Sequence, residues 1–290
     1  MYNIEKLGKM GYLSITEVER LTKNKETWYS DIINNSKELV KELGWNKDNL
    51  YYYIVSVFEY VSTIYYDGTF IFSIPPLITV DQISDNIERF SHLKEMYYQM
   101  YAEGEYSSII CLTDNKYKAL VFNSLYEKMD KDQRLREFLG IHKICKNSLS
   151  AIPFKRIIDL LEYGSKSLLG KRVKSKLADD QGYITVYRGF EKADKKTLSA
   201  IPWSTSIESV LKYSDKFGSE DFVLMGKVHI SNVGFIYDEE YSDFVLREEY
   251  EEEDGDYDSY IDYKDWENEL LVIPNSVTDI RKLDRVKVEC

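Results

Sequence analysis

The chain has few cysteine and few histidine residues. Its three cysteines, Cys111, Cys145 and Cys290, are too few and too scattered for a disulfide framework or a CxxC metal motif. His142 lies near Cys145 in the sequence, but no obvious third group would orient a cysteine nucleophile there. We therefore expect a protein of a reducing compartment that binds no metal.

Long apolar runs are also missing. Apolar residues make up 43% of the chain, but no uninterrupted run approaches the roughly 18 to 20 residues that a membrane-spanning helix needs. The first residues, Met1 to Leu7, lack a charged segment followed by an apolar core, which argues against a secretory signal peptide. We expect no membrane span, and either a cytoplasmic protein or one delivered into a host cell by another route.

Basic residues are outnumbered, so that the formal net charge is −12. Nucleic-acid binding depends largely on clustered Lys and Arg, and we expect none here. The negative excess lies in residues 238–265, where fourteen acidic residues face only Arg247 and Lys264. This tyrosine-containing segment is interpreted first as a solvated insertion. The alternative is a docking surface for a basic protein partner, with the tyrosines as anchors.

The first half of the chain has mainly helical patterns. Apolar residues recur at helical spacing over residues 32–43 and 83–97, and Gly44 and Gly104 follow as stop signals. Four tyrosines within residues 51–60 are interpreted as an aromatic helix in a core or at a domain interface. Asp67 and Gly68, between two aromatic runs, predict a hairpin. We expect residues 1–146 to form a mainly α-helical region of unknown role.

The second half has shorter elements. Polar residues 146–148 and then Pro153 predict a domain border near residue 147. An amphipathic stretch over residues 157–169 precedes strand-like runs at residues 183–188, 222–230, 267–273 and 277–288. We therefore expect residues 147–290 to form an α+β domain built on antiparallel strands, which makes the whole chain α+β.

Arg188 stands near the end of the first of these strands. The two-residue period of a strand puts Arg188 on the same face as Ile184 and Val186, which directs its guanidinium to the inner side of a sheet. A phosphate group is one good partner there, because the planar guanidinium matches two phosphate oxygens. Gly189 would let a ligand approach the backbone. Alone, Tyr187-Arg188-Gly189 is read more readily as an edge arginine paired with an acid.

A serine triplet, Ser204-Thr205-Ser206, follows Trp203. Apolar residues at helical spacing come next, which makes Ser206 the expected N-cap of a helix and the triplet a turn between a strand and that helix. Ser204 could alternatively hydrogen-bond a catalytic carboxylate, because a hydroxyl both donates and accepts. Taken by itself, the triplet favours the capping interpretation.

Two glutamates flank Asn268 at the start of an apolar run that reads as a strand buried on both faces. At positions i and i+2, Glu267 and Glu269 are expected to project from one face, with Asn268 on the other. Two like charges at a buried strand are costly unless a ligand or cation balances them, so such pairs tend to be functional. The competing interpretation is that both acids merely prolong the acidic segment before them.

In order and approximate spacing these three motifs resemble the Arg/Ser-Thr-Ser/Glu-x-Glu signature of mono-ADP-ribosyltransferases, which transfer ADP-ribose from NAD to a target. The resemblance covers roughly residues 150–288. It implies that Arg188, Gly189 and the triplet Ser204, Thr205 and Ser206 bind NAD. It also implies that Ser204 orients Glu269, that Glu269 stabilises the ribose cation, and that Glu267 acts on the incoming nucleophile.

The family comparison further implies an arginine acceptor, because members with Glu at the first position of the Glu-x-Glu motif commonly modify arginine. Such enzymes occur as bacterial toxins and as phage proteins. Two other functions stay open from the sequence. One is an NAD glycohydrolase on the same scaffold, with water as the acceptor, and the other is a non-catalytic interaction protein that uses its acidic segment.

Overall fold

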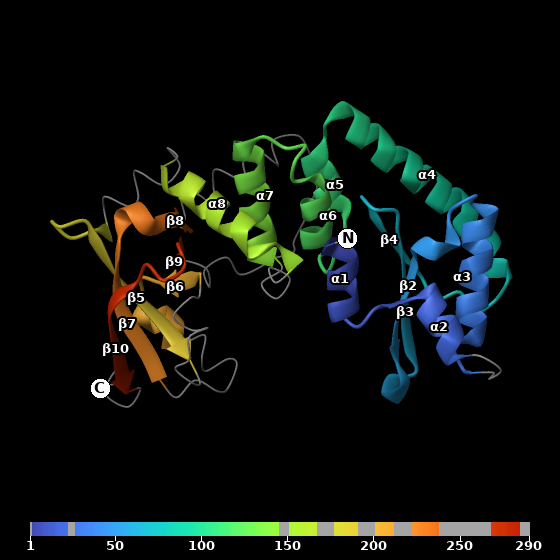
Figure 1. Ribbon diagram of the computed structural model, residues 1–290, viewed down its shortest axis with the longest axis horizontal. Coiled ribbons are helices and arrows are strands. Elements are labelled where there is room, and N and C mark those ends of the chain that lie inside the picture. Colours follow the sequence, from blue (N-terminus) through green and yellow to red (C-terminus); the bar gives the residue numbers. More distant parts are fainter. Residues whose placement is uncertain are drawn as a thin grey trace, which may run out of the picture. The chain divides into compact units, whose positions relative to one another are not determined.

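The computed structural model describes residues 2–22, 27–144, 151–166, 177–190, 201–211, 222–237 and 268–284 (Figure 1). The chain divides into two compact units, Met1–Pro153 and Phe154–Cys290, and each is considered by itself. Among the described residues, no helix is both long enough and apolar enough to cross a membrane.

The first unit contains a four-stranded antiparallel sheet in the order β1-β2-β3-β4. Its strands are β1 (Leu13–Ser14), β2 (Leu50–Val55), β3 (Tyr60–Tyr66) and β4 (Ile71–Ile74). The described helices of this unit are α1 (Tyr2–Lys9), α2 (Ile15–Leu21), α3 (Ser30–Glu42), α4 (Asp81–Glu103), α5 (Tyr106–Leu112), α6 (Lys118–Leu125) and α7 (Lys131–Ile144), with single 3-10 turns at Lys47–Asn49 and Ser56–Phe58.

Helices cover both faces of this sheet (Figure 1). On one face, the Tyr52 hydroxyl of β2 lies 2.9 Å from the Ser36 hydroxyl of α3. On the other, the side-chain amide of Asn3 in α1 donates to the Tyr66 hydroxyl of β3 at 3.2 Å and to the Leu120 carbonyl of α6 at 2.9 Å. The sheet is therefore the middle layer of the unit.

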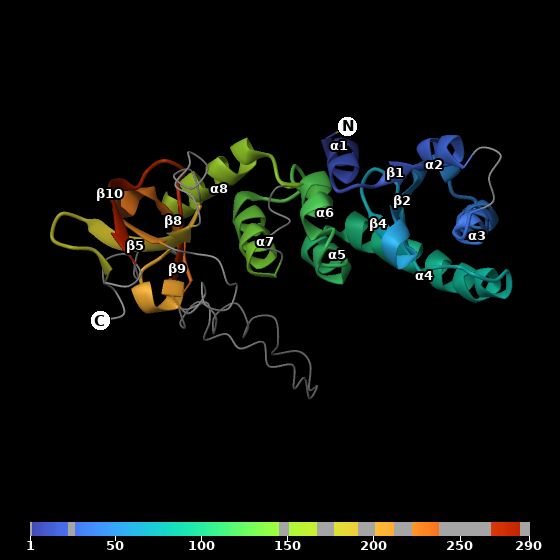
Figure 2. The same ribbon diagram turned by 90° about the horizontal axis from the view of Figure 1, so that it is seen from below.

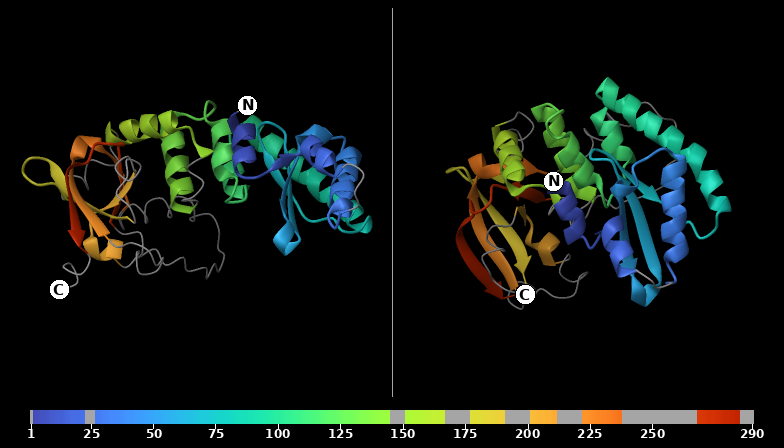
Figure 3. Two further views of the ribbon diagram at one scale, coloured as in Figure 1. Left: turned by 60° about the horizontal axis from the view of Figure 1, so that its bottom comes forward. Right: turned by 45° about the vertical axis from the view of Figure 1, so that its right-hand side comes forward.

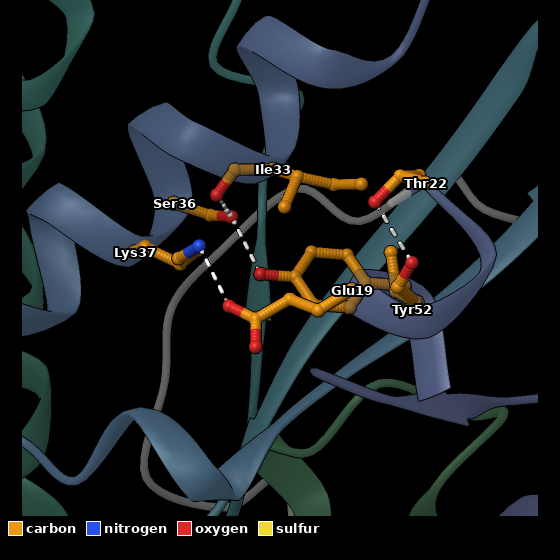
Figure 4. Close-up of polar contacts among 7 residues, drawn as sticks. Glu19, Thr22, Ile33, Ser36, Lys37 and Tyr52 are labelled. Carbon is orange, nitrogen blue, oxygen red and sulfur yellow. Dashed lines mark hydrogen bonds and ion pairs between the residues drawn. The ribbon is translucent and has the colours of Figure 1, made fainter. Parts of the chain in front are cut away.

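Figure 4 shows how the buried Tyr52 is held. Its ring is fully buried, and its hydroxyl meets Ser36, whose own hydroxyl donates to the Ile33 carbonyl at 2.9 Å. Burial raises the pKa of the Tyr52 phenol well above its ordinary value. Nearby, Lys37 and Glu19 form an ion pair at 2.8 Å that links α3 to α2. One satisfied hydroxyl pair thus lies inside an otherwise apolar interface.

The aromatic helix expected over residues 51–60 was wrong, because these residues form β2, a 3-10 turn and the start of β3. Tyr51 and Tyr52 point to opposite faces and both are buried, so the strand shows no alternation of polar and apolar residues. The mainly helical region therefore contains a sheet that the sequence pattern did not show.

Other predictions for this unit are confirmed. Helices α3 and α4 end at Gly44 and Gly104, which have φ of 65° and 82°, the left-handed conformation that glycine adopts easily. The predicted hairpin joins β3 to β4, and the Asp67 carboxylate accepts from the amides of Thr69 at 2.9 Å and Phe70 at 2.8 Å. An aspartate that bonds the backbone ahead of it is a typical turn-former.

The second unit is built on a six-stranded sheet in the order β10-β7-β5-β6-β9-β8, with every pairing antiparallel. Figures 2 and 3 show this sheet from other sides, and in Figure 2 helix α8 (Phe154–Lys166) lies beside the β8 edge. The strands are β5 (Tyr183–Phe190), β6 (Pro202–Ser204), β7 (Phe222–His229), β8 (Val233–Ile236), β9 (Glu269–Val272) and β10 (Thr278–Asp284). Mixed helix and antiparallel sheet agree with the expected α+β class.

One hydrophobic cluster of this unit lies on one face of the sheet. It gathers apolar side chains from strands that are far apart in the sequence, among them Ile184, Val186, Trp203, Leu224, Val228, Leu270 and Val272. Helix α8 packs closely against β8 at Gly234, where a Cβ atom would lie 2.9 Å from the Cα of Leu161. The sequence pattern had indicated β5, β7, β9 and β10, and the strand predicted before the serine triplet is β6, but the short strand β8 was missed.

Candidate functional site

Three adjacent strands carry the three sequence motifs. Strand β6 lies between β5 and β9, and its residue Ser204 is paired with Tyr187 on one side and with Glu269 on the other. Directly opposed residues in antiparallel strands have Cα atoms about 4.5 to 5.5 Å apart, with side chains on the same face. Tyr187, Ser204 and Glu269 therefore form one row across the sheet.

Strand β6 ends in the serine triplet, which forms a local turn. The Ser204 hydroxyl accepts from the Ser206 amide at 3.1 Å and donates to the Ser206 carbonyl at 3.0 Å. The Ser206 hydroxyl accepts from the Ser209 amide at 3.1 Å, three residues on, as an N-cap does. The capping role expected for Ser206 is confirmed. In this structure the Ser204 hydroxyl is engaged in the same turn.

Glu208, in the first turn of the helix that begins at residue 207, completes this cap. Its carboxylate accepts from the Ser206 hydroxyl at 2.9 Å. Its own backbone N–H, and secondarily the Ser206 hydroxyl, lower the pKa of the Glu208 carboxyl. A carboxylate at a helix start is further favoured by the helix dipole.

The strand that carries the Glu-x-Glu motif begins later than the sequence suggests. Strand β9 starts at Glu269, and Asn268 before it has φ of 84°, in the left-handed region. The expectation of a strand from residue 267 with Asn268 facing away from the two acids was therefore wrong at Asn268, because a left-handed residue interrupts the strand alternation. Glu267 lies outside the described residues. The prediction of a strand buried on both faces is confirmed, since Leu270, Leu271 and Val272 are fully buried.

Arg188 lies in the neighbouring row rather than in the row of Ser204 and Glu269. It is paired with Leu224 of β7 and shares its face with Ile184 and Val186, as predicted from the two-residue period. That face carries the hydrophobic cluster of Ile184 and Val186, and strand alternation places Ser204 and Glu269 on the other. Arg188 is half-buried, and its guanidinium donates to the Pro202 carbonyl on β6. Gly189 pairs with Val223 within the β5–β7 ladder.

Two backbone contacts at Glu269 were not foreseen. The Thr205 amide donates to the Asn268 carbonyl at 2.8 Å, and the Tyr237 amide donates to the Glu269 carbonyl at 2.8 Å. Asparagine tolerates the left-handed region better than most residues, so its place just before a strand was a signal from which the turn at Asn268 could have been found. Tyr237 gave no signal, because its contact depends on how β8 lies against β9.

The acidic segment 238–265 lies outside the described residues, as do most of the residues between β5 and β6. Within the described part of the chain, no group of three or more His, Cys, Asp and Glu side chains is arranged to hold a metal ion. The chemistry available from the described motifs is a half-buried guanidinium, a hydroxyl and a carboxylate on three neighbouring strands.

Comparisons of the chain with protein-family models, with curated proteins and with solved structures found no match in any of the three.

Proposed function

We propose that the second unit is a mono-ADP-ribosyltransferase that moves ADP-ribose from NAD to a protein acceptor, with arginine as the modified residue and nicotinamide as the product released. The observation that carries this proposal is the pairing of Ser204 with Glu269 across β6 and β9, with Arg188 on the next strand. The three motifs of the signature thus come from neighbouring strands although they are distant in the sequence.

The proposed reaction breaks the bond between nicotinamide and the ribose of NAD. The bonding electron pair leaves with nicotinamide, and the ribose becomes cationic in the transition state. The Glu269 carboxylate would stabilise this developing charge, which is the kind of contact that contributes most to catalysis. A guanidinium nitrogen of the acceptor then forms the new bond to the ribose carbon, and Glu267 would take up the proton that it loses.

Arg188 would bind the pyrophosphate of NAD. A guanidinium has five N–H donors in a rigid fork, and the contact with the Pro202 carbonyl orients this one at the β5–β6 boundary. Strand alternation puts Arg188 on the other face from Glu269. A dinucleotide that contacts both side chains would therefore have to pass around the end of β6, which is only three residues long. The Arg188 role is therefore tested apart from the carboxylates.

Labelled NAD incubated with a cell lysate tests the proposal, with protein labelling and nicotinamide release measured side by side. Glu269→Ala should lower both by at least about a hundredfold, the scale of losing one electrostatic contact with a transition state. Glu267→Gln should abolish labelling and keep nicotinamide release. The matched control is Glu162→Gln, which changes an exposed carboxylate on α8 in the same unit and should behave as the native chain.

The same assay distinguishes the transferase from an NAD glycohydrolase and from a non-catalytic interaction protein. Nicotinamide release without labelled protein from the native chain would indicate an NAD glycohydrolase. Neither product, from a folded native chain, would indicate a non-catalytic interaction protein. Equal loss of labelling and release in Glu267→Gln would refute the division of roles between the two glutamates.

A further inference from the structure

The backbone of Glu269 is held on both sides at the proposed site. The peptide group before it is fixed by the Thr205 amide, which donates to the Asn268 carbonyl at 2.8 Å. The peptide group after it is fixed by the Tyr237 amide, which donates to the Glu269 carbonyl at 2.8 Å. Both peptide planes that flank Glu269 are thus held from neighbouring segments.

The first of these contacts depends on an unusual backbone conformation. Asn268 has φ of 84°, and a residue other than glycine in this region is uncommon, although asparagine tolerates it better than most. The Thr205 hydroxyl adds a longer contact of 3.4 Å to the same Asn268 carbonyl. The serine triplet and the Glu-x-Glu motif thus meet through one carbonyl group.

We propose that the contact between Thr205 and Asn268, called here the Thr205–Asn268 clamp, is a positioning device that sets the catalytic geometry of Glu269. This inference rests on the proposed function, in which Glu269 stabilises the ribose cation. A displacement of about 1 Å at a reacting group can lower the rate a hundredfold, so a fixed peptide plane before Glu269 has a direct effect on turnover. Thr205 and Asn268 are positioning residues, since they act through Glu269.

A matched pair of variants isolates the backbone conformation. Asn268→Gly and Asn268→Ala both remove the side-chain amide, and they differ only in the Cβ atom that disfavours the left-handed region. The kcat of Asn268→Ala for nicotinamide release should lie about tenfold below that of Asn268→Gly, the factor that corresponds to the cost of a Cβ in this conformation. Asn268→Gly should keep kcat within about threefold of native, and KM for NAD should stay similar in both.

Amide hydrogen exchange of Thr205, followed by NMR, measures the clamp without reference to activity. The Thr205 amide should be protected in the native chain and in Asn268→Gly, and it should exchange about tenfold faster in Asn268→Ala than in Asn268→Gly. The Tyr237 amide serves as the internal reference, because a global loss of stability would speed the exchange of both amides, whereas loss of the clamp would speed that of Thr205 alone.

Equal kcat in the glycine and alanine variants would refute the positioning role of the clamp. So would a Thr205 amide that exchanges at an unprotected rate in an active native chain. The proposed function fails in a different way. A native chain that releases no nicotinamide, with its Thr205 amide protected, would refute the transferase proposal and the catalytic role of the clamp, while the contact itself would stand.

Discussion

The packing of α8 against the site-bearing sheet gives a sharp test at Gly234. A Cβ atom at this position would lie 2.7 Å from Cδ2, 2.8 Å from Cβ and 2.9 Å from Cα of Leu161. The last of these is a backbone atom, which a rotamer change cannot move. Gly234 has no left-handed φ, so space alone decides the effect of a substitution. Gly234→Ala should therefore push α8 away from β8.

The size of that overlap sets the free-energy cost of the substitution. Adding one methyl group to a close-packed interface costs about 1–3 kcal/mol, since side chains and backbone must shift to admit it. A cost of that size increases local opening by about 5- to 150-fold, at about 1.4 kcal/mol for each factor of ten. Strand β8 is the neighbour of β9, which carries Glu269, so we also expect weaker protection of the Tyr237 amide.

Hydrogen exchange with mass spectrometry is the assay, because it reports on residues 154–166 and 233–237 separately from the first unit. The matched control is Gly140→Ala in α7, where nothing lies within 4 Å of the added Cβ. A glycine replaced by alanine inside a helix gains about 0.5–1 kcal/mol, so this control should protect α7 slightly better. Unchanged exchange of both α8 and β8 in Gly234→Ala would refute the described contact between them.

Three further results are expected. Ser36→Ala should cost about 1–3 kcal/mol by chemical denaturation, because it leaves the buried Tyr52 hydroxyl without the Ser36 oxygen, and adding Tyr52→Phe should recover part of the loss. The Ser14 amide, and then its hydroxyl, lower the pKa of Glu17, so this carboxylate stabilises the fold above its unfolded pKa and the effect is lost as pH falls through the lowered value. Ser14→Ala should raise the pKa of Glu17 toward its ordinary value in a carboxyl NMR titration. Arg188→Lys should raise KM for NAD roughly tenfold with a smaller change in kcat.

Each of these three predictions has a result that would contradict it. Additive losses in the Ser36 and Tyr52 variants would mean that the two hydroxyls do not interact. A Glu17 pKa unaffected by Ser14→Ala would assign its shift to the backbone amide alone. An Arg188→Lys enzyme with native KM would remove Arg188 from NAD binding and leave it as a structural partner of Pro202.

Local sequence signals correctly predicted helix ends, a hairpin turn and a helix cap. Glycines in left-handed conformations ended α3 and α4, Asp67 formed the predicted hairpin turn, and Ser206 capped the helix that follows it. These features depend on contacts within a few residues of the chain. They are therefore legible in a single sequence without any knowledge of the fold.

Other features were missed or misplaced. Strand β2 was taken for a helix because both of its faces are covered, and the short strand β8 has too few residues to show a period. The left-handed Asn268 changed the geometry expected for the Glu-x-Glu motif. Of these, β8 is decided by its pairing with the distant β9, whereas β2 pairs with the adjacent β3 and asparagine at position 268 is itself a local signal.

By itself the sequence determined which residues make up the three motifs, the class of fold, and the face of β5 on which Arg188 lies. Only the tertiary structure decided that Ser204 stands opposite Glu269, that Arg188 occupies the adjoining row, and that Thr205 contacts Asn268. The physical reason is register. Which residue of one strand faces which residue of another is set by how side chains such as Trp203 and Leu270 pack together across the sheet, and a shift of one residue would turn every side chain to the other face.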